Sequence, residues 1–454
     1  MIILLLLIQV VIGTAILIKF RVAFNTFFFF SLSALLGVAV FSIIPFLLQL
    51  MYVPITAFTI FGSISLLVLL ALFIILRSQR GMKGSMVASK LSFQLYELPF
   101  LLIILYLVAI SAWRCFYLPP TPFDAISGGE LVAEYAIREK TMINSAFSVE
   151  SSGNTLKPPF LTSLQVIYKM AGIPFGQVWL INIVICFLVI LYQQLIQALH
   201  KIIAGFLLVA FVAIPEMYGY TYMALYDYSN AVFFFVSIFF FVQFFIWEHR
   251  SYFWLSALLM AIATYIRPEM PALILMILPL IFFHQINNKH PLLKSIITAL
   301  VFAIPSMLTY LISVTLYINF YLPQEYSVSE QINPDLWSFF AAFNSITKAN
   351  SALIFSKNGV EYYSYFIYFF LVLLALEFIF KKKITRNARS YLYAIAVVYL
   401  AYPLLNHLLP GLTIENSVKR GYFKMFPLMV MYCCNNALLI DLSTKIKRWE
   451  SNSI

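Results

Sequence analysis

Long apolar runs separated by short polar breaks fill most of the chain, and this pattern predicts membrane-spanning helices. Many runs hold about 17 to 25 residues, the length an α-helix needs to cross a bilayer. They lack the two-residue alternation of a transmembrane β-barrel. We therefore expect an all-α, polytopic transmembrane protein with about 13 spans. The expected spans cover residues 2–18, 23–50, 53–76, 97–118, 176–198, 202–218, 229–247, 251–266, 270–286, 292–321, 362–380, 390–408 and 421–440.

The longest polar segment, residues 118–160, interrupts this pattern. It opens with Pro119, Pro120 and Pro122, which end the preceding apolar run because proline cannot continue a helix. Residues 127–142 then predict a short amphipathic helix, with apolar side chains on one face and charged ones around the other. We expect the loop 119–175, with its short amphipathic helices, to form one wall of a functional site.

The composition supports this class and excludes others. Hydrophobic residues make up 63% of the chain and charged residues only 10%, whereas soluble domains carry about 25% charged residues. The net charge of +11 does not indicate a nucleic-acid partner, because the basic residues lie in short loops between spans. The four cysteines lie in apolar runs without disulfide or metal spacing. The first run lacks a basic N-terminal region and a cleavage site, so we expect a span rather than a signal peptide.

The loops alternate in charge, which predicts the orientation. One set of loops holds 18 of the 29 basic residues, whereas 13 of the 18 acidic residues lie on the opposite side. The positive-inside rule makes the basic side cytoplasmic, with the N-terminus outside and the C-terminus inside. Asp124, Asp227, Arg267, Glu269 and Arg420 then all face outward. Five candidate residues are thus expected on one face of the membrane.

Two acidic residues are the candidates for catalysis. Asp124 follows closely after the prolines at the end of a span, where a carboxylate is sufficiently hydrated to ionise and can act as a general base. It could instead cap the following helix, although Ser127 is available for that position. Asp227 lies at a span mouth among tyrosines, where an interfacial cap is the alternative to a functional acid. Glu216 and His407 are weaker candidates.

Four basic residues and one acid are the candidates for substrate binding. Arg267 and Glu269 end one span and Arg420 begins the last one. Arginine presents a fixed fork of donors to a phosphate, although it also reaches to lipid headgroups at span ends. Lys157 and Arg138 add positive charge from the outer loop. No phosphate-binding glycine loop or metal motif occurs in the sequence, so no metal ligand is predicted, and a divalent cation stays open as a cofactor.

Four segments, in this order, resemble motifs of the GT-C superfamily of membrane glycosyltransferases, which includes protein O-mannosyltransferases and the lipid A aminoarabinose transferase. PTPFDA (120–125) resembles the acidic motif of the first large outer loop, and KPPFLTSL (157–164) is similar to the stretch before the next span. YMALYDYSNAVFFF (222–235) resembles the second acidic motif, and AIATYIRPEMPALI (261–274) the span-end motif with a basic residue. The resemblance covers about residues 96–440. It divides the chain into an N-terminal transmembrane extension, 1–95, and a catalytic region, 96–454.

The resemblance implies an inverting transfer of a hexose or pentose from a polyprenyl-phosphate donor to a lipid- or glycan-linked acceptor, on the outer face of the cytoplasmic membrane. Asp124 would match the catalytic acidic residue, Asp227 the second one, and Arg267 and Arg420 the phosphate contacts. The acidic loop follows the fourth span here, and Ala125 stands where a second acid would follow, so the donor and metal use stay open. The alternatives are a transporter of polysaccharide or lipid-linked sugar, which predicts charged residues in mid-span, and an O-antigen-type polymerase.

Overall fold

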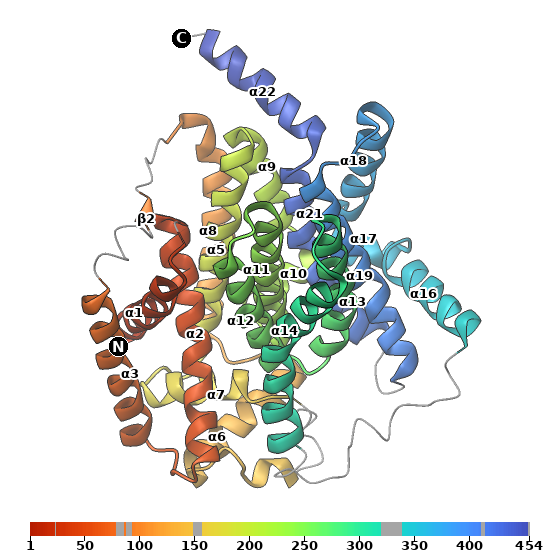
Figure 1. Cartoon of the computed structure of the whole chain (residues 1–454). Helices are drawn as coiled ribbons and strands as arrows, with labels where there is room; N and C mark the ends of the chain where they lie inside the picture. Colours follow the sequence, from red (N-terminus) through yellow and green to blue (C-terminus); the bar gives the residue numbers. More distant parts are fainter. Residues whose placement is uncertain are drawn as a thin grey trace.

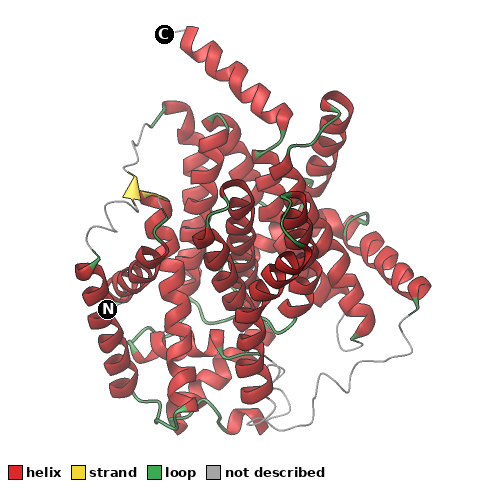
Figure 2. Cartoon of the chain, viewed as in Figure 1, coloured by secondary structure: helices red, strands yellow, loops and turns green. Residues whose placement is uncertain are grey.

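Helices account for almost all of the structure. The computed structural model of the chain describes residues 1–22, 24–78, 86–87, 93–148, 157–318, 338–409 and 414–452. These residues form a bundle of helices joined by loops (Figure 1, Figure 2). The strands among them, β1 (Phe24–Asn25) and β2 (Met86–Val87), hold two residues each and pair in parallel. The prediction of an all-α fold is confirmed.

Nine helices in the described part of the chain are long and apolar enough to cross a membrane. They are α1 (Ile2–Phe20), α2 (Thr26–Leu50), α3 (Ala57–Arg77), α5 (Leu98–Tyr117), α8 (Val178–Ala198), α11 (Tyr226–Trp247), α13 (Met270–Asn287), α14 (Leu292–Tyr310) and α19 (Arg386–Leu408). Two bent pairs raise the number to eleven if each pair is one span. In the first, α17 (Lys357–Tyr363) meets α18 (Phe366–Lys381) at 95°; in the second, the run Ile414–Cys434 meets α22 (Ala437–Asn452) at 53°. The chain is thus a multi-pass membrane protein.

The thirteen expected spans differ from this number because two helices are short and two are bent. The segments 202–218 and 251–266 correspond to α9 (Lys201–Val212), of 12 residues, and α12 (Arg250–Ile266), of 17 residues. Helix α9 stops early because Pro215 begins a separate short helix, α10 (Pro215–Gly219), and a residue before proline is disfavoured in the helical conformation. Ile214 accordingly has an extended backbone, with φ −65° and ψ 112°.

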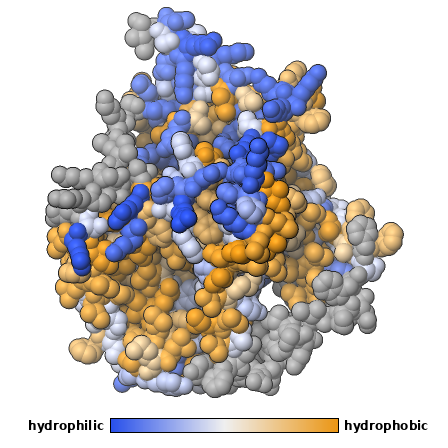
Figure 3. Space-filling model, viewed as in Figure 1, coloured by the Kyte–Doolittle hydropathy of each residue, from blue (hydrophilic) through white to orange (hydrophobic). Residues whose placement is uncertain are grey.

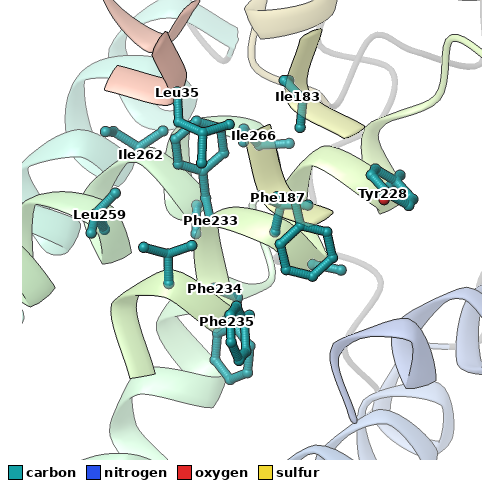
Figure 4. Close-up of a cluster of buried hydrophobic side chains, with 14 of the residues drawn as sticks. Leu35, Ile183, Phe187, Tyr228, Phe233, Phe234, Phe235, Leu259, Ile262 and Ile266 are labelled. Carbon is teal, nitrogen blue, oxygen red and sulfur yellow. The ribbon is translucent and has the colours of Figure 1, made fainter. Parts of the chain in front are cut away.

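Helix α11 lies in the core, and 19 of its 22 residues are buried. A helix that is apolar on every side can bury its whole surface among neighbours. Figure 4 shows residues 233–235 of this helix among side chains from other helices, including Leu35 of α2. The ring of Phe160, which begins α7 (Phe160–Met170), meets the rings of Phe233 and Tyr265 edge-on, with centroids 6.3 and 6.1 Å apart. Helices α7, α11 and α12 therefore share one aromatic core.

The N-terminal region 1–95 contributes to this core as well as to the periphery. Helices α1 and α2 cross so closely that a Cβ on Gly13 would lie 1.8 Å from the backbone oxygen of Ser33, and small residues allow such crossings in membranes. Gln9 donates a hydrogen bond to the Tyr168 hydroxyl at 2.9 Å, which ties α1 to α7. Helix α2 is mostly buried, whereas α3 is mostly exposed. Helices α1 and α2 of this region therefore pack against the rest of the bundle.

Shorter helices complete the described chain. They are η1 (Leu95–Glu97), the π-helical turn η2 (Ala125–Glu130), α6 (Leu131–Glu139), η3 (Ser145–Ser148), the π-helical turn η4 (Leu311–Leu316), α16 (Phe339–Leu353), the π-helical turn η8 (Ile414–Val418), α20 (Lys419–Gly421), η9 (Tyr422–Lys424) and α21 (Met425–Cys434). The amphipathic helix predicted at 127–142 corresponds to η2 followed by α6.

The two ends of the bundle carry different structures. Helices α6 and α7 lie at one end and α22 at the other (Figure 1). At the α22 end, Lys201 pairs with Glu97 at 2.6 Å and Lys381 pairs with Asp441. Figure 3 shows hydrophilic side chains gathered around α22 and the adjoining helix ends, with a broad apolar surface below them. The candidate site described next is built at the other end, where α5 and α12 finish and α11 and α13 begin.

Candidate active site

The junction between α12 and α13 places a cation opposite an acid of α11. Arg267 precedes Pro268, and the clash with the proline ring disfavours the helical conformation, so α12 ends at Ile266 and Arg267 is extended, with φ −139° and ψ 126°. Asp227 stands in the first turn of α11. The amide of Asn230, one turn further along α11, donates to the backbone oxygen of Ala263 at 2.7 Å. That bond fixes the register of the two helices, so that Asp227 and Arg267 face each other.

Arg267 is held between two carboxylates. Its Nη2 lies 2.5 Å from Asp227 Oδ1, and its Nε lies 3.2 Å from Glu269 Oε1. The Asp227 side chain is only 3% exposed, and the side chains of Arg267 and Glu269 are each less than one-fifth exposed. Burial alone would lower the pKa of Arg267, but the two carboxylates more than offset it and raise that pKa. The Arg267 guanidinium is therefore always protonated, and it lies at a site that is partly shielded from solvent.

A second ion pair joins Asp124, which precedes η2, to Arg420 of α20. Arg420 Nη1 donates to Asp124 Oδ2 at 2.8 Å. Asp124 stands directly before η2 but makes no capping hydrogen bond with its side chain, and Ser127 donates to the Phe123 backbone oxygen instead. The Asp124 side chain is 43% exposed and that of Arg420 19%. The helix-cap alternative for Asp124 therefore lacks its hydrogen bond, and the carboxylate is directed at a cation.

The guanidinium of Arg420 keeps one donor unused. Its Nε is buried and has no hydrogen-bond acceptor within the part of the chain that the structure describes. The same guanidinium lies over the ring of Tyr220, with 5.8 Å from Cζ to the ring centroid. A buried donor without an acceptor costs free energy. An anion that reaches Arg420 Nε would supply the missing acceptor while Nη1 stays on Asp124.

Two lysines complete the positive charge of the site. Lys424 is 1% exposed, and its Nζ donates to the Tyr402 hydroxyl at 2.5 Å, which in turn donates to Glu269 Oε1 at 3.4 Å. Lys157 Nζ lies over the Tyr226 ring, 5.3 Å from its centroid. Burial and the nearby charge of Arg267 lower the pKa of Lys157 to about 8, with Asp227 and Asp124 opposing them.

These residues form one cluster, because Asp227 interacts electrostatically with Arg267, Arg420, Lys157 and Lys424 together. A further pair, Lys419 with Glu216 at 2.6 Å, lies next to it in the chain. We call Asp124, Lys157, Asp227, Arg267, Glu269, Tyr402, Arg420 and Lys424 the charged cluster. It holds four cations and three carboxylates, so it carries a net positive charge before any ligand binds.

The structure brings together six of the seven residues singled out in the sequence. Arg138 is the exception: it lies exposed on α6, with its guanidinium over the Tyr135 ring at 6.0 Å. Lys424 and Tyr402 were not predicted. Lys424 could have been found, because it stands four residues after Arg420 and thus on the same helical face. Tyr402 carries no such signal, since it lies inside an apolar run.

A separate ion network holds η2, α6 and α7 in place. Lys169 of α7 pairs with Glu130 and Glu134, and Glu130 also accepts from the amide of Gln165 at 2.8 Å. The same amide group of Gln165 accepts from the Trp179 indole at 3.1 Å. Burial raises the pKa of Glu130, and Lys169 opposes this only in part. These bonds join η2, α6 and α7 to α8, which positions Asp124 at the start of η2.

The described residues contain no group of three or more histidine, cysteine, aspartate or glutamate side chains arranged to hold a metal ion. Comparison of the chain with protein-family models, with curated proteins and with solved structures gives no match. The fold and the site by themselves define a multi-pass helical membrane protein with a partly buried charged cluster at one end of its bundle.

Proposed function

We propose that this protein is a membrane glycosyltransferase of the GT-C type, which moves a sugar from a polyprenyl-phosphate donor to a hydroxyl of a lipid- or glycan-linked acceptor. The observation that carries this proposal is the double engagement of Arg420. One of its nitrogens holds Asp124, and a second, buried nitrogen has no acceptor in the described part of the chain. A single guanidinium thus has room for a carboxylate and a phosphate oxygen side by side.

The reaction needs a base and a stabilised leaving group. The acceptor hydroxyl attacks the anomeric carbon of the donor, its proton passes to Asp124, and the bond from that carbon to the phosphate oxygen breaks. Asp124 is the most exposed acid of the charged cluster, so an acceptor from the aqueous side can reach it. The leaving polyprenyl phosphate gains negative charge, which Arg420, Arg267 and Lys157 stabilise.

Asp227 and Glu269 hold the cations rather than take part in bond making. Both carboxylates are turned toward Arg267, and both are less exposed than Asp124. Their charge keeps the guanidinium in place while the site is without a phosphate, because an unpaired buried cation is costly. The charged side chains thus divide into one base, three phosphate-binding cations and two positioning acids, while Lys424 is engaged with the Tyr402 hydroxyl.

The location of the charges favours transfer over transport. A transporter requires charged side chains along a path through the membrane, whereas the charged cluster lies at helix ends. By the positive-inside rule, this end faces the outside of the cytoplasmic membrane, because the α22 end carries most of the basic residues. Lipid-linked donors need no nucleotide-binding domain, and they diffuse within the membrane to the site.

Product release tests the proposal without knowledge of the acceptor. Purified protein in liposomes is given a panel of polyprenyl-phosphate sugars and an extract of envelope glycolipids as acceptor, and mass spectrometry follows free polyprenyl phosphate. Release of polyprenyl phosphate by the wild type supports glycosyl transfer. If a labelled donor crosses the bilayer and no polyprenyl phosphate is released, the protein is a transporter rather than a glycosyltransferase.

The orientation has its own test. Single cysteines at Lys140 and Lys383, both exposed and at opposite ends, are labelled with a membrane-impermeant maleimide. The four native cysteines are buried and serve as the unlabelled background. We expect Lys140→Cys to react in intact cells and Lys383→Cys only after permeabilisation. The reverse result would place the charged cluster in the cytoplasm and exclude catalysis on the outer face.

A further inference from the structure

A polar cavity lies at the opposite end of the bundle from the charged cluster. It opens where α8 and α11 end, α19 begins and α21 meets α22, and its volume is about 160 Å³. Its lining includes five amide side chains, from Gln194, Gln197, Gln243, Asn387 and Asn435, beside Tyr391 and Cys434. Of the described residues that line it, none is charged.

Most of these amide groups have capacity left for hydrogen bonds. Two of them make one bond each within their own helix, because Gln243 accepts from an indole one turn away and Asn435 donates to a backbone oxygen one turn away. Gln194, Gln197 and Asn387 make no side-chain hydrogen bond to any other residue that the structure describes. Each amide offers two donors and a carbonyl acceptor. The cavity therefore presents mixed donors and acceptors from four separate helices.

The neutrality of the cavity is notable because it lies at the basic end of the molecule. Arg386, which precedes the lining residue Asn387 in α19, is engaged elsewhere, because its Nη2 lies 2.7 Å from His284 Nδ1. Neutral amides do not compensate the charge of a phosphate or a carboxylate. A hydroxyl group, which donates and accepts at once, matches an amide lining without leaving a charge unpaired.

We propose that this cavity binds a neutral polyhydroxyl group, either a free sugar or the headgroup of a glycolipid. The volume is smaller than the roughly 300 to 1,000 Å³ of pockets for drug-sized ligands, and suits one small ring with its hydroxyls. Val242, Ile246 and Met431 form an apolar wall for the ring face, and Ile246 is exposed toward the outside of the bundle. A lipid chain can leave along that side. This site is independent of the function proposed for the charged cluster.

Binding to the full-length protein in phosphatidylcholine nanodiscs tests this site. Three probes are titrated: monoglucosyl diacylglycerol, methyl glucoside, and phosphatidylglycerol as an anionic lipid. The double variant Gln194→Met/Asn387→Leu removes two amides at similar volume. Ala198→Phe, at an exposed position on the rim, keeps every amide but fills the opening. Asn287→Leu, an exposed amide at the same end that does not line the cavity, is the matched control.

We expect saturable binding of a glucose-containing probe, weakened about tenfold by loss of two hydrogen bonds in the double variant. Ala198→Phe should weaken it at least as much, and Asn287→Leu should bind as the wild type does. Binding of methyl glucoside identifies a free sugar as ligand, and binding of the glycolipid alone identifies a headgroup. The proposal is overturned if neither glucose-containing probe saturates, if phosphatidylglycerol binds equally well, or if both cavity variants bind normally.

Discussion

Replacement of Asp124 by asparagine separates catalysis from structure. The carboxylate accepts from Arg420 at 2.8 Å, and asparagine can accept the same bond through its amide oxygen. The Asp124 side chain is 43% exposed, so solvent screens the ion pair. Its loss should change the free energy of unfolding by no more than about 1 kcal/mol. Folding and membrane insertion should therefore survive.

The expected effect on the rate is much larger. A positioned general base contributes about 10² to 10⁴ in rate, which corresponds to roughly 3 to 5 kcal/mol in the activation free energy. We expect Asp124→Asn to lose this factor in the release of polyprenyl phosphate from donor in liposomes. Asp124→Glu keeps the base but moves it by one methylene, and should be strongly impaired because small misplacements of reacting groups are costly.

The matched control is Asp441→Asn. Asp441 also forms an exposed ion pair, with Lys381, but at the opposite end of the bundle. It should therefore keep full activity with a similar small change in stability. If Asp124→Asn releases polyprenyl phosphate at nearly the wild-type rate, Asp124 is structural, and the base would have to be sought at Asp227 or Glu269.

Three further results are expected. Arg267→Lys keeps the charge but loses the planar fork, so the rate should fall roughly 10- to 100-fold for one lost charge-assisted hydrogen bond; an unchanged rate would assign Arg267 to headgroup contact. The pKa of Lys157 is lowered from 10.5 to about 8, so donor affinity should fall as the pH rises through about 8, and Lys157→Arg should move that fall to higher pH. The pKa of Lys157 is lower in the folded state than in the unfolded chain, so the contribution of Lys157 to the free energy of unfolding rises with pH over that range. Thermal unfolding therefore distinguishes a loss of donor affinity from a loss of stability. A donor affinity that does not depend on pH would exclude a phosphate contact by Lys157. Gly13→Ala should cost about 1 to 3 kcal/mol in thermal unfolding because of its contact with Ser33, whereas Gly62→Ala, with nothing within 4 Å, should not; equal melting temperatures would contradict the close crossing.

The helices themselves could be predicted from the sequence because hydropathy is a local property. Each apolar run that was expected to span the membrane is helical over most of its length, since the backbone in a membrane must satisfy its own hydrogen bonds. The prolines also act locally: Pro215 and Pro268 end the helices before them. The alternation of charge between loops and the short helices η2, α6 and α7 can likewise be predicted from local sequence.

The partners of the charged side chains depend on tertiary structure alone. Arg420 and Asp124 are 296 positions apart, and nothing in either segment selects the other. Which helices become neighbours depends on how side chains of many helices fit together, as where Gly13 lets α1 approach α2 and Asn230 sets α11 against α12. The burial of α2, the contact of Tyr402 with Lys424 and the amide-lined cavity follow from that packing. Local polarity thus determines where each helix begins and ends in the sequence, whereas the close fit of the helix surfaces decides which polar groups meet.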